Sequence, residues 1–243
     1  MVLSRIFGRV LDFILPVACP YCNATRGDSK VPFLCSSCWN DFSLLSGPVC
    51  PTCGRPFASP EALSHAPGHE CGACRLTPPQ FDQALSVGSF EGPLREAIHL
   101  FKYRPCRAFG KPLGIWMAAH VRTLTDLDIV MPVPLHKKRL RQRGFNQALL
   151  LAHRMSKAHR IPLSFDNLFR TRSTRPQVEL NGEERIRNVA GAFALRRPEE
   201  VASRKIVLVD DVFTTGATLN ECASVLKDAG AAHVIACTLA RAE

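Results

Sequence analysis

The sequence predicts an α/β protein with a parallel sheet, preceded by a cysteine-rich region that binds zinc. Eight cysteines before residue 75 form four C-x-x-C pairs. Beyond residue 79, short β-forming apolar stretches alternate with segments of helical periodicity. Strands separated by helices favour a parallel sheet, whose ligands lie at the carboxyl ends of the strands. We divide the chain at Thr77-Pro78-Pro79 into residues 1–77 and 78–243, and we expect two separate cores.

The cysteine pairs predict two structural zinc ions bound by cysteine alone. Two C-x-x-C turns complete one closed tetrahedral Zn²⁺ site. Sequential pairing gives a double zinc ribbon and is favoured because each site then closes a short loop, while a cross-braced arrangement is the alternative. His65 and His69 are interpreted as loop residues. The predicted ligands are Cys19, Cys22, Cys35, Cys38, Cys50, Cys53, Cys71 and Cys74.

The composition is that of a soluble globular chain. It has 243 residues, of which 46% are hydrophobic and 21% charged. No apolar run approaches the roughly 18–20 residues that a membrane helix needs. Asp12 interrupts the apolar N-terminal stretch, and residues 3–14 have helical spacing, so we expect an amphipathic helix there rather than a signal peptide. We therefore expect a cytoplasmic protein without a membrane span.

Positive charge is concentrated in the middle of the chain. The formal net charge is +10, and residues 129–165 contain eight Lys or Arg and no Asp or Glu. The densest run is His136 to Arg143. A positive field of this length indicates a phosphate-bearing partner, either a small ligand or a nucleic acid.

Local periodicity predicts the elements beyond the cysteines. The final helix is expected to stop at Gly230, a residue type typical of helix C-termini. We expect strands at 84–90, 129–134, 163–170, 205–209 and 232–240, and helices around 94–102, 108–123, 145–152 and 219–230.

The stretch VLVDDVFTTGAT, residues 207–218, predicts a ligand site. An apolar strand leads into Asp210 and Asp211, and buried carboxylates are costly unless they are solvated or hold a ligand. Residues 214–218 then offer hydroxyls and backbone N–H groups at the start of a helix, which suits a phosphate. The predicted ligand carries a phosphate and a group that two carboxylates bind.

This stretch resembles the signature with which type I phosphoribosyltransferases bind phosphoribosyl diphosphate (PRPP). In that family the two acids hold the ribose 2′- and 3′-hydroxyls, which implies this role for Asp210 and Asp211. The following turn binds the 5′-phosphate. The resemblance therefore implies phosphate ligands at Thr214, Thr215, Gly216, Ala217 and Thr218.

Residues 100–103, 132–152 and 172–193 narrow the resemblance to the ComF family (ComFC and GntX-like proteins), over nearly the whole chain. Members carry a zinc region before a PRPP-binding domain and are linked to uptake and processing of single-stranded DNA in natural transformation. The resemblance implies PRPP with Mg²⁺ as ligand, and single-stranded DNA and DNA-uptake or recombination proteins as partners. Two alternatives remain open. One is an active phosphoribosyltransferase on an unidentified nucleobase-type acceptor without a DNA role, and the other is a PRPP sensor without catalysis.

The resemblance also implies roles outside the signature. The loop after strand 129–134 corresponds to the pyrophosphate loop, which implies Arg139, Arg143 and Gly144 as diphosphate ligands. Lys102 is a further diphosphate candidate, and complementing a helix dipole is its alternative role. Residues 172–188 resemble the flexible hood over the active site, from which Gln177 and Arg185 are candidates to touch the ligand. An enzyme of this kind would displace diphosphate at ribose C1 through an oxocarbenium-like transition state.

Overall fold

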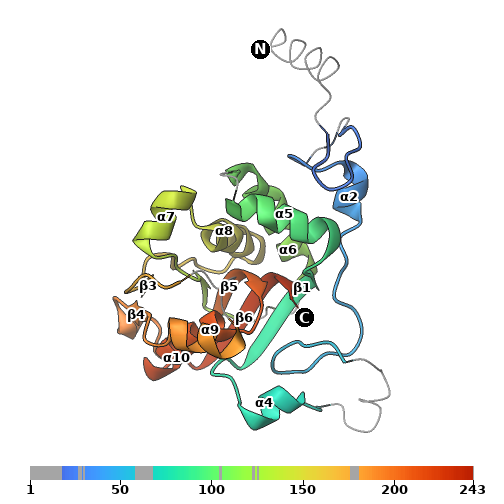
Figure 1. Ribbon diagram of the computed structural model, residues 1–243. Coiled ribbons are helices and arrows are strands. Elements are labelled where there is room, and N and C mark those ends of the chain that lie inside the picture. The colour runs from blue at the N-terminus through green and yellow to red at the C-terminus, as the bar shows by residue number, and fades with distance from the viewer. Residues whose placement is uncertain are drawn as a thin grey trace.

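The structure is a computed structural model of the chain, shown in Figure 1. The helix expected over residues 3–14, His65 and Gln177 lie outside the described residues. None of the helices within the described part is long and apolar enough to cross a membrane. The structure describes residues 18–26, 29, 31–57, 68–103, 106–121, 124, 126–175 and 181–242.

Four parallel strands in the order β1-β6-β5-β2 form the central sheet, as the sequence predicts. β5 lies inside the sheet, and its residues Ile206 to Val209 are all fully buried. This explains its continuous apolar run, because a parallel strand is covered on both faces. The strands are β1 (Gln83–Ser89), β2 (Ile129–Pro132), β5 (Lys205–Phe213) and β6 (His233–Arg241).

Helices cover both faces of this sheet. Val207 and Val209 face a core shared with α5, α6 and α8, whereas Ile206 and Leu208 face a core shared with α10. Figure 1 shows this layering. The helices are α5 (Gly92–Tyr103), α6 (Gly110–His120), α8 (Gln147–His159) and α10 (Ala217–Asp228), with 3₁₀ turns η1 (Arg107–Phe109) and η3 (Pro198–Glu200).

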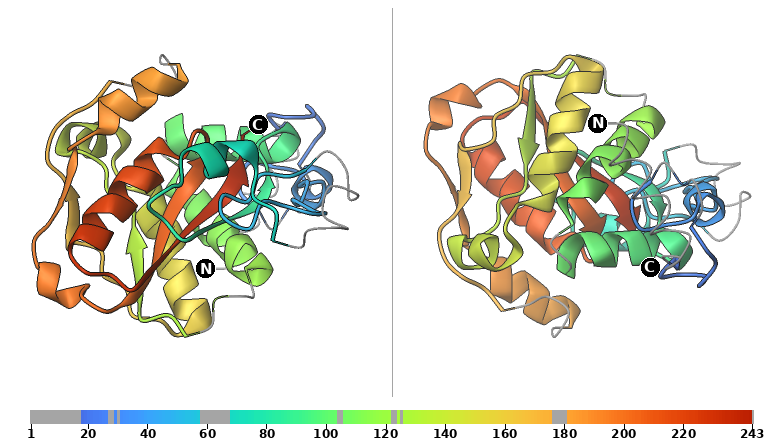
Figure 2. Two further views of the ribbon diagram at one scale, coloured as in Figure 1. Left: turned by 90° about the horizontal axis from the view of Figure 1, so that it is seen from below. Right: turned by 90° about the horizontal axis from the view of Figure 1, so that it is seen from above.

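A small antiparallel sheet, β3 (Leu168–Arg170) with β4 (Phe193–Leu195), flanks the central sheet. Helix α9 (Gly182–Val189) lies between these strands in the chain and begins with a capping box of Asn181 and Glu184. We call the described residues 168–175 and 181–195 the hood. Figure 2 shows it on the opposite side of the molecule from the first cysteine pairs.

Three expected elements differ from those observed. The strand expected at 163–170 is reduced to β3, because Leu163 makes only an isolated bridge with Val130. The expected loop after β2 contains helix α7 (Lys137–Arg143), which ends at Gly144 in a left-handed conformation with φ 75°. β5 continues past Val209 to Phe213, because its pairing with β6 continues, and the two aspartates therefore lie within the strand.

The cysteine-rich region packs directly on the sheet, so the expectation of separate cores is wrong. The backbone N–H of Ala84 in β1 donates to the carbonyl of Thr52 at 2.7 Å. A Cβ on Gly54 would lie 2.6 Å from the Ala84 carbonyl oxygen, so only glycine permits this close approach. Two short helices, α2 (Ser36–Asn40) and α4 (Gly72–Leu76), carry cysteines into the cores on the two faces. The division at Thr77 stays a prediction.

Candidate functional site

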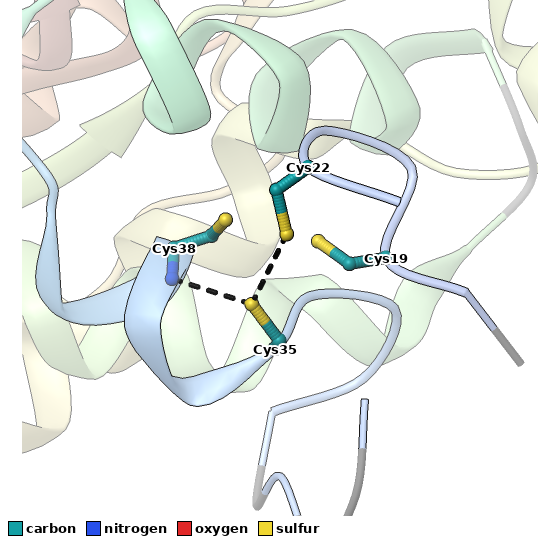
Figure 3. Close-up of side chains that lie close together, drawn as sticks. All are labelled: Cys19, Cys22, Cys35 and Cys38. Carbon is teal, nitrogen blue, oxygen red and sulfur yellow. Dashed lines mark hydrogen bonds between the residues drawn. The ribbon is translucent and has the colours of Figure 1, made fainter. Parts of the chain in front are cut away.

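The eight cysteines form two clusters, and the Sγ atoms of each cluster all lie within 4.8 Å of one another. The first cluster is Cys19, Cys22, Cys35 and Cys38 (Figure 3), and the second is Cys50, Cys53, Cys71 and Cys74. The pairing is therefore sequential, as the sequence favours, and not cross-braced. His69 contacts the Phe57 ring, with centroids 5.8 Å apart, and belongs to neither cluster.

The surroundings of the sulfur atoms fit a zinc site. Backbone N–H groups point at sulfur: that of Cys38 at Cys35 Sγ (3.5 Å) and that of Cys71 at Cys50 Sγ (3.3 Å). Burial alone would raise the pKa of the Cys19 thiol, but hydrogen bonds from the backbone and side chains around it lower that pKa to about 6. Four clustered cysteine sulfurs, one of which accepts from a backbone N–H in each cluster, are the donor set of a structural Zn²⁺.

A polar cavity of about 160 Å³, which we call the ligand pocket, lies at the carboxyl ends of β5 and β2. This is the edge at which parallel α/β sheets bind ligands. It is lined by the end of α5, the loop after β2, helices α7 and α8, the hood, the end of β5, and the turn that follows β5. Its charged lining residues are Lys102, Arg139, Arg143, Arg170, Arg175, Arg185, Asp210 and Asp211.

The two aspartates occupy different surroundings in this pocket. Asp211 is 7% exposed and forms an ion pair with Lys102, with Nζ and Oδ1 2.8 Å apart. Asp210 Oδ1 accepts a hydrogen bond from the Asp211 backbone N–H at 2.8 Å. Burial and the neighbouring Asp211 charge raise the pKa of Asp210 to about 7, although Lys102 counteracts them. Lys102 is therefore part of the pocket and not only the last cation of a helix.

Residues 214–218, which we call the phosphate loop, connect β5 to the N-terminus of α10. Gly216 has φ 77°, and a Cβ there would lie 2.6 Å from the Phe213 ring, so glycine is required. Thr214 and Thr218 line the ligand pocket, and Gly216 and Ala217 line a small hollow beside it. Thr215 instead faces a second cavity next to the second cluster. The loop thus presents most, but not all, of its predicted phosphate ligands on one side.

Helix α7 sends two of its arginines into the pocket. Arg139 and Arg143 are one turn apart, on the same face of the helix, and both line the pocket. Gln147 accepts a hydrogen bond from Arg143 Nη1 at 3.2 Å, and the Tyr103 ring centroid lies 5.5 Å below the guanidinium. Gly144 does not line the pocket and serves as the left-handed C-cap of α7.

The hood supplies one predicted and three unpredicted lining residues. Arg185 lines the pocket as expected, and so do Arg170, Thr174 and Arg175. Thr174 and Arg175 lie within residues 172–193, which resemble the family, so the sequence did offer a signal that these two residues lie near the ligand. Arg170 ends a stretch that the sequence predicts only as a strand, and the hood fold brings it to the pocket with Asp210, so the sequence pattern offered no signal for it.

Two family models match the chain. A double zinc ribbon domain matches residues 10–75, and a phosphoribosyl transferase domain matches residues 145–243. The described clusters and the phosphate loop fall within these two matched regions.

Curated relatives cover most of the chain. DNA utilization protein YhgH of Escherichia coli (strain K12) is 35% identical over 192 residues, or 76% of this chain and 81% of the relative. Competence protein F of Haemophilus influenzae is 32% identical over 216 residues, or 86% of this chain and 90% of the relative. Competence protein ComFC of Bacillus subtilis is 29% identical over 228 residues, or 89% of this chain and 86% of the relative.

Solved structures resemble only part of the chain. A glutamine PRPP amidotransferase from B. subtilis matches 52% of this chain and 25% of its own, at 20% identity and a TM-score of 0.37. A purine phosphoribosyltransferase from Pyrococcus horikoshii matches 55% of this chain and 73% of its own, at 19% identity and a TM-score of 0.34. The matches to relatives above 30% identity cover most of the length of each relative. This chain also joins a double zinc ribbon domain to a phosphoribosyltransferase domain, and it therefore belongs to the ComF family.

Proposed function

We propose that this chain binds PRPP with Mg²⁺ in the ligand pocket and acts in the uptake or processing of single-stranded DNA. One observation carries the first part. The two aspartates, the cations of α5 and α7, and the phosphate loop all border one pocket at the end of the sheet. Each part suits a different group of PRPP.

The chemistry of each part sets its role. Asp210 and Asp211 accept hydrogen bonds from the ribose hydroxyls, and N–H groups of the phosphate loop donate to the 5′-phosphate. Lys102, Arg139 and Arg143 contact the diphosphate. Mg²⁺ suits this site because it binds through one or two carboxylates together with substrate phosphates, and it would offset diphosphate charge. Two zinc ions, one in each cluster, hold the ribbons in place.

The same arrangement supports the first half of a phosphoribosyl transfer. Cations around the diphosphate stabilise the charge that grows on this leaving group. No histidine, cysteine or glutamate is among the described residues that line the pocket. Binding of PRPP is therefore the part of the function that we propose.

The DNA role rests on the relatives and on the outer face of α7. Relatives carry the names competence protein and DNA utilization protein. Lys137, Lys138 and Arg141 are exposed on α7, whereas Arg139 and Arg143 are half-buried at the pocket. A helix with one cationic face in a ligand pocket and a second one in solvent suits both a small phosphate ligand and a polyanion.

Calorimetric titration with PRPP–Mg²⁺ tests the proposal. Wild-type protein should bind, and the double variant Asp210→Asn/Asp211→Asn should lose at least about tenfold in affinity per lost charge-assisted bond. Asp228→Asn, an exposed aspartate on α10, is the matched control and should bind normally. Unchanged affinity in the folded double variant would disprove the assignment of the ribose site.

A further inference from the structure

The hood wall of the ligand pocket has a chemistry that the PRPP assignment does not use. Three guanidinium groups line it, those of Arg170, Arg175 and Arg185, together with the Thr174 hydroxyl. The diphosphate, ribose and 5′-phosphate are already assigned to α5, α7, β5 and the phosphate loop. The hood groups therefore face the part of the pocket that a second ligand would occupy.

Arg170 has the most distinctive surroundings of the three. Its guanidinium stacks on the Phe193 ring, 5.1 Å from the centroid, and its Nη2 donates to Thr174 Oγ1 at 2.5 Å. Its Nε is buried without a hydrogen-bond partner. Burial lowers the pKa of this guanidinium, with the nearby Asp210 acting in the opposite direction. A buried N–H without a partner is costly, which favours a ligand that accepts a hydrogen bond nearby.

Three acidic side chains in the described part of the surrounding segments have partners other than Arg170 and Arg175. Glu183 pairs with Arg187, Glu184 caps α9, and Glu221 accepts from the Gly191 backbone N–H at 2.6 Å. Among the residues that the structure describes, no carboxylate forms an ion pair with Arg170 or Arg175. The positive charges of Arg170 and Arg175 are thus not offset by an ion pair with any acid among the described residues.

The side chains of this wall offer hydrogen-bond donors to a ligand and few acceptors. A guanidinium only donates, because it has no acceptor lone pair at any accessible pH. The Thr174 oxygen already accepts from Arg170, which leaves its O–H as a further donor. A neutral nucleobase presents donors and acceptors side by side and would leave its donors unmatched here, whereas a carboxylate or phosphate presents acceptors alone.

The charge of the whole pocket agrees with this. It has six cationic lining residues and two carboxylates. Mg²⁺ and the three cations outside the hood offset the diphosphate, and the 5′-phosphate, at about −1.5 to −2, meets the N-terminus of α10. The two carboxylates offset two of the six cations, so a positive excess remains, and this assignment places no phosphate group of PRPP against the hood arginines.

We infer that the hood wall binds an oxyanion, so that the ligand which shares the pocket with PRPP is a carboxylate- or phosphate-bearing molecule and not a neutral base. This inference rests on the proposed binding of PRPP for the location of the second ligand. It concerns different residues, so the two can fail separately.

Matched ligand pairs test the inference by calorimetry on the zinc-loaded full chain, with and without PRPP–Mg²⁺. Orotate against uracil tests a carboxylate, and deoxycytidine 5′-monophosphate against deoxycytidine tests a phosphate. We expect the anionic member of at least one pair to bind about tenfold or more tightly than its neutral partner. The pair that shows the preference identifies the source of the oxyanion.

Hood variants give the second readout. Arg175→Gln and Arg185→Gln should each weaken the anionic ligand by about tenfold, reduce its advantage over the neutral ligand, and change PRPP affinity less than about threefold. Arg187→Gln is the control, because Arg187 lies on the same helix, is exposed and does not line the pocket. Arg170→Lys keeps the charge but loses the fork and should weaken binding in a chain that still folds.

Three results would overturn the inference. One is equal or tighter binding of the neutral member in both pairs. Another is the absence of binding by either anion at millimolar concentration. The third is a parallel loss of PRPP and anion affinity in the hood variants, which would assign these arginines to PRPP itself. Failure of the wild-type chain to bind PRPP would refute the proposed function, while the titrations without PRPP would still decide the hood site.

Discussion

The Nη1 atom of Arg241, at the end of β6, donates a hydrogen bond to the backbone carbonyl of Cys53 at 2.6 Å, across 188 positions of sequence. The same guanidinium lies 4.3 Å from the Phe213 ring centroid and 3.9 Å from Cys53 Sγ. The Phe213 ring in turn fills the space beside Gly216. One buried side chain therefore contacts both a zinc knuckle and the residue that supports the phosphate loop.

Arg241→Met should test this connection. The substitution keeps an apolar stem but leaves the Cys53 carbonyl without its charged donor, so we expect the free energy of unfolding to fall by about 1.5–3 kcal/mol in a denaturant titration. Arg204→Met is the control, because Arg204 is exposed and forms a 3.7 Å ion pair with Asp128. Its effect should stay within about 0.5 kcal/mol. Equal effects of both substitutions would mean that the Arg241 contact does not stabilise the fold.

Cys50→Ser should destabilise the sheet as well as the ribbon. Cys50 is 1% exposed and lies in the same core as Phe81 and Ala84. Loss of its thiolate weakens zinc binding, and zinc binding energy in such sites contributes directly to folding. We expect the zinc content to fall by one ion per chain and the main thermal transition to move to lower temperature.

Cys106→Ser serves as the control for this change, because Cys106 is half-buried and belongs to neither cluster. Its zinc content should match that of the wild type. Loss of one zinc ion from Cys50→Ser with an unchanged main transition would show that the second ribbon folds independently, as the sequence alone had suggested.

Local patterns made the clusters and the aspartate pair predictable from the sequence. The cysteines of each cluster lie close together in the chain, and Asp210 and Asp211 follow directly on an apolar strand. The shared cores depend on contacts such as Thr52 to Ala84, between segments whose pairing no local pattern encodes.

Helix α7 could not be predicted for a different reason. Leu140 is the only aliphatic residue within it, and none of its residues is buried, so the helix has no apolar periodicity. Its ends are instead set by the His136 side chain, which accepts from the Lys138 N–H, and by the left-handed Gly144. Capping and terminal geometry thus define an element that hydrophobic patterning misses.

Asp210 should make the ligand-free protein less stable as pH rises. Its pKa is raised to about 7 in the folded chain, whereas an unperturbed aspartate titrates near about 3.9. Between these two values the folded state holds more protons than the unfolded state, so the contribution of this group is greatest below about pH 4 and is lost as pH rises to about 7.

Asp210→Asn should remove this dependence, because the amide oxygen still accepts from the Asp211 N–H while the charge is gone. We expect the free energy of unfolding at pH 8 to rise by about 1–3 kcal/mol. PRPP affinity should fall in the same variant, since binding uses the ionised carboxylate. In the wild type, PRPP affinity should increase from pH 6 to pH 8 by more than in the variant, which reports the titration of the phosphate alone. A variant that is less stable than the wild type at pH 8 would contradict the assigned pKa.

The two faces of α7 should separate DNA binding from PRPP binding. The exposed cations Lys137, Lys138 and Arg141 contact single-stranded DNA in our proposal, and affinity then comes from counterion release. Three such contacts give a slope of log K against log salt of about −2.1, at about −0.7 per phosphate. Lys137→Gln/Lys138→Gln should reduce the magnitude of this slope by about 1.4 and leave PRPP affinity unchanged.

Arg143→Gln should give the opposite pattern, because Arg143 faces the ligand pocket, where Gln147 and Tyr103 hold its guanidinium. We expect about a tenfold loss or more of PRPP affinity, with a salt slope for DNA that changes by less than about 0.7. Lys205→Gln, which changes an exposed lysine at the opposite end of β5 from the pocket, controls for the loss of net charge and should alter neither measurement.

Parallel losses of affinity for both ligands in the variants on the two faces of α7 would mean that PRPP and DNA share one phosphate site. A DNA affinity that does not depend on salt would exclude counterion release altogether and would move the DNA contact from α7 to the zinc ribbons.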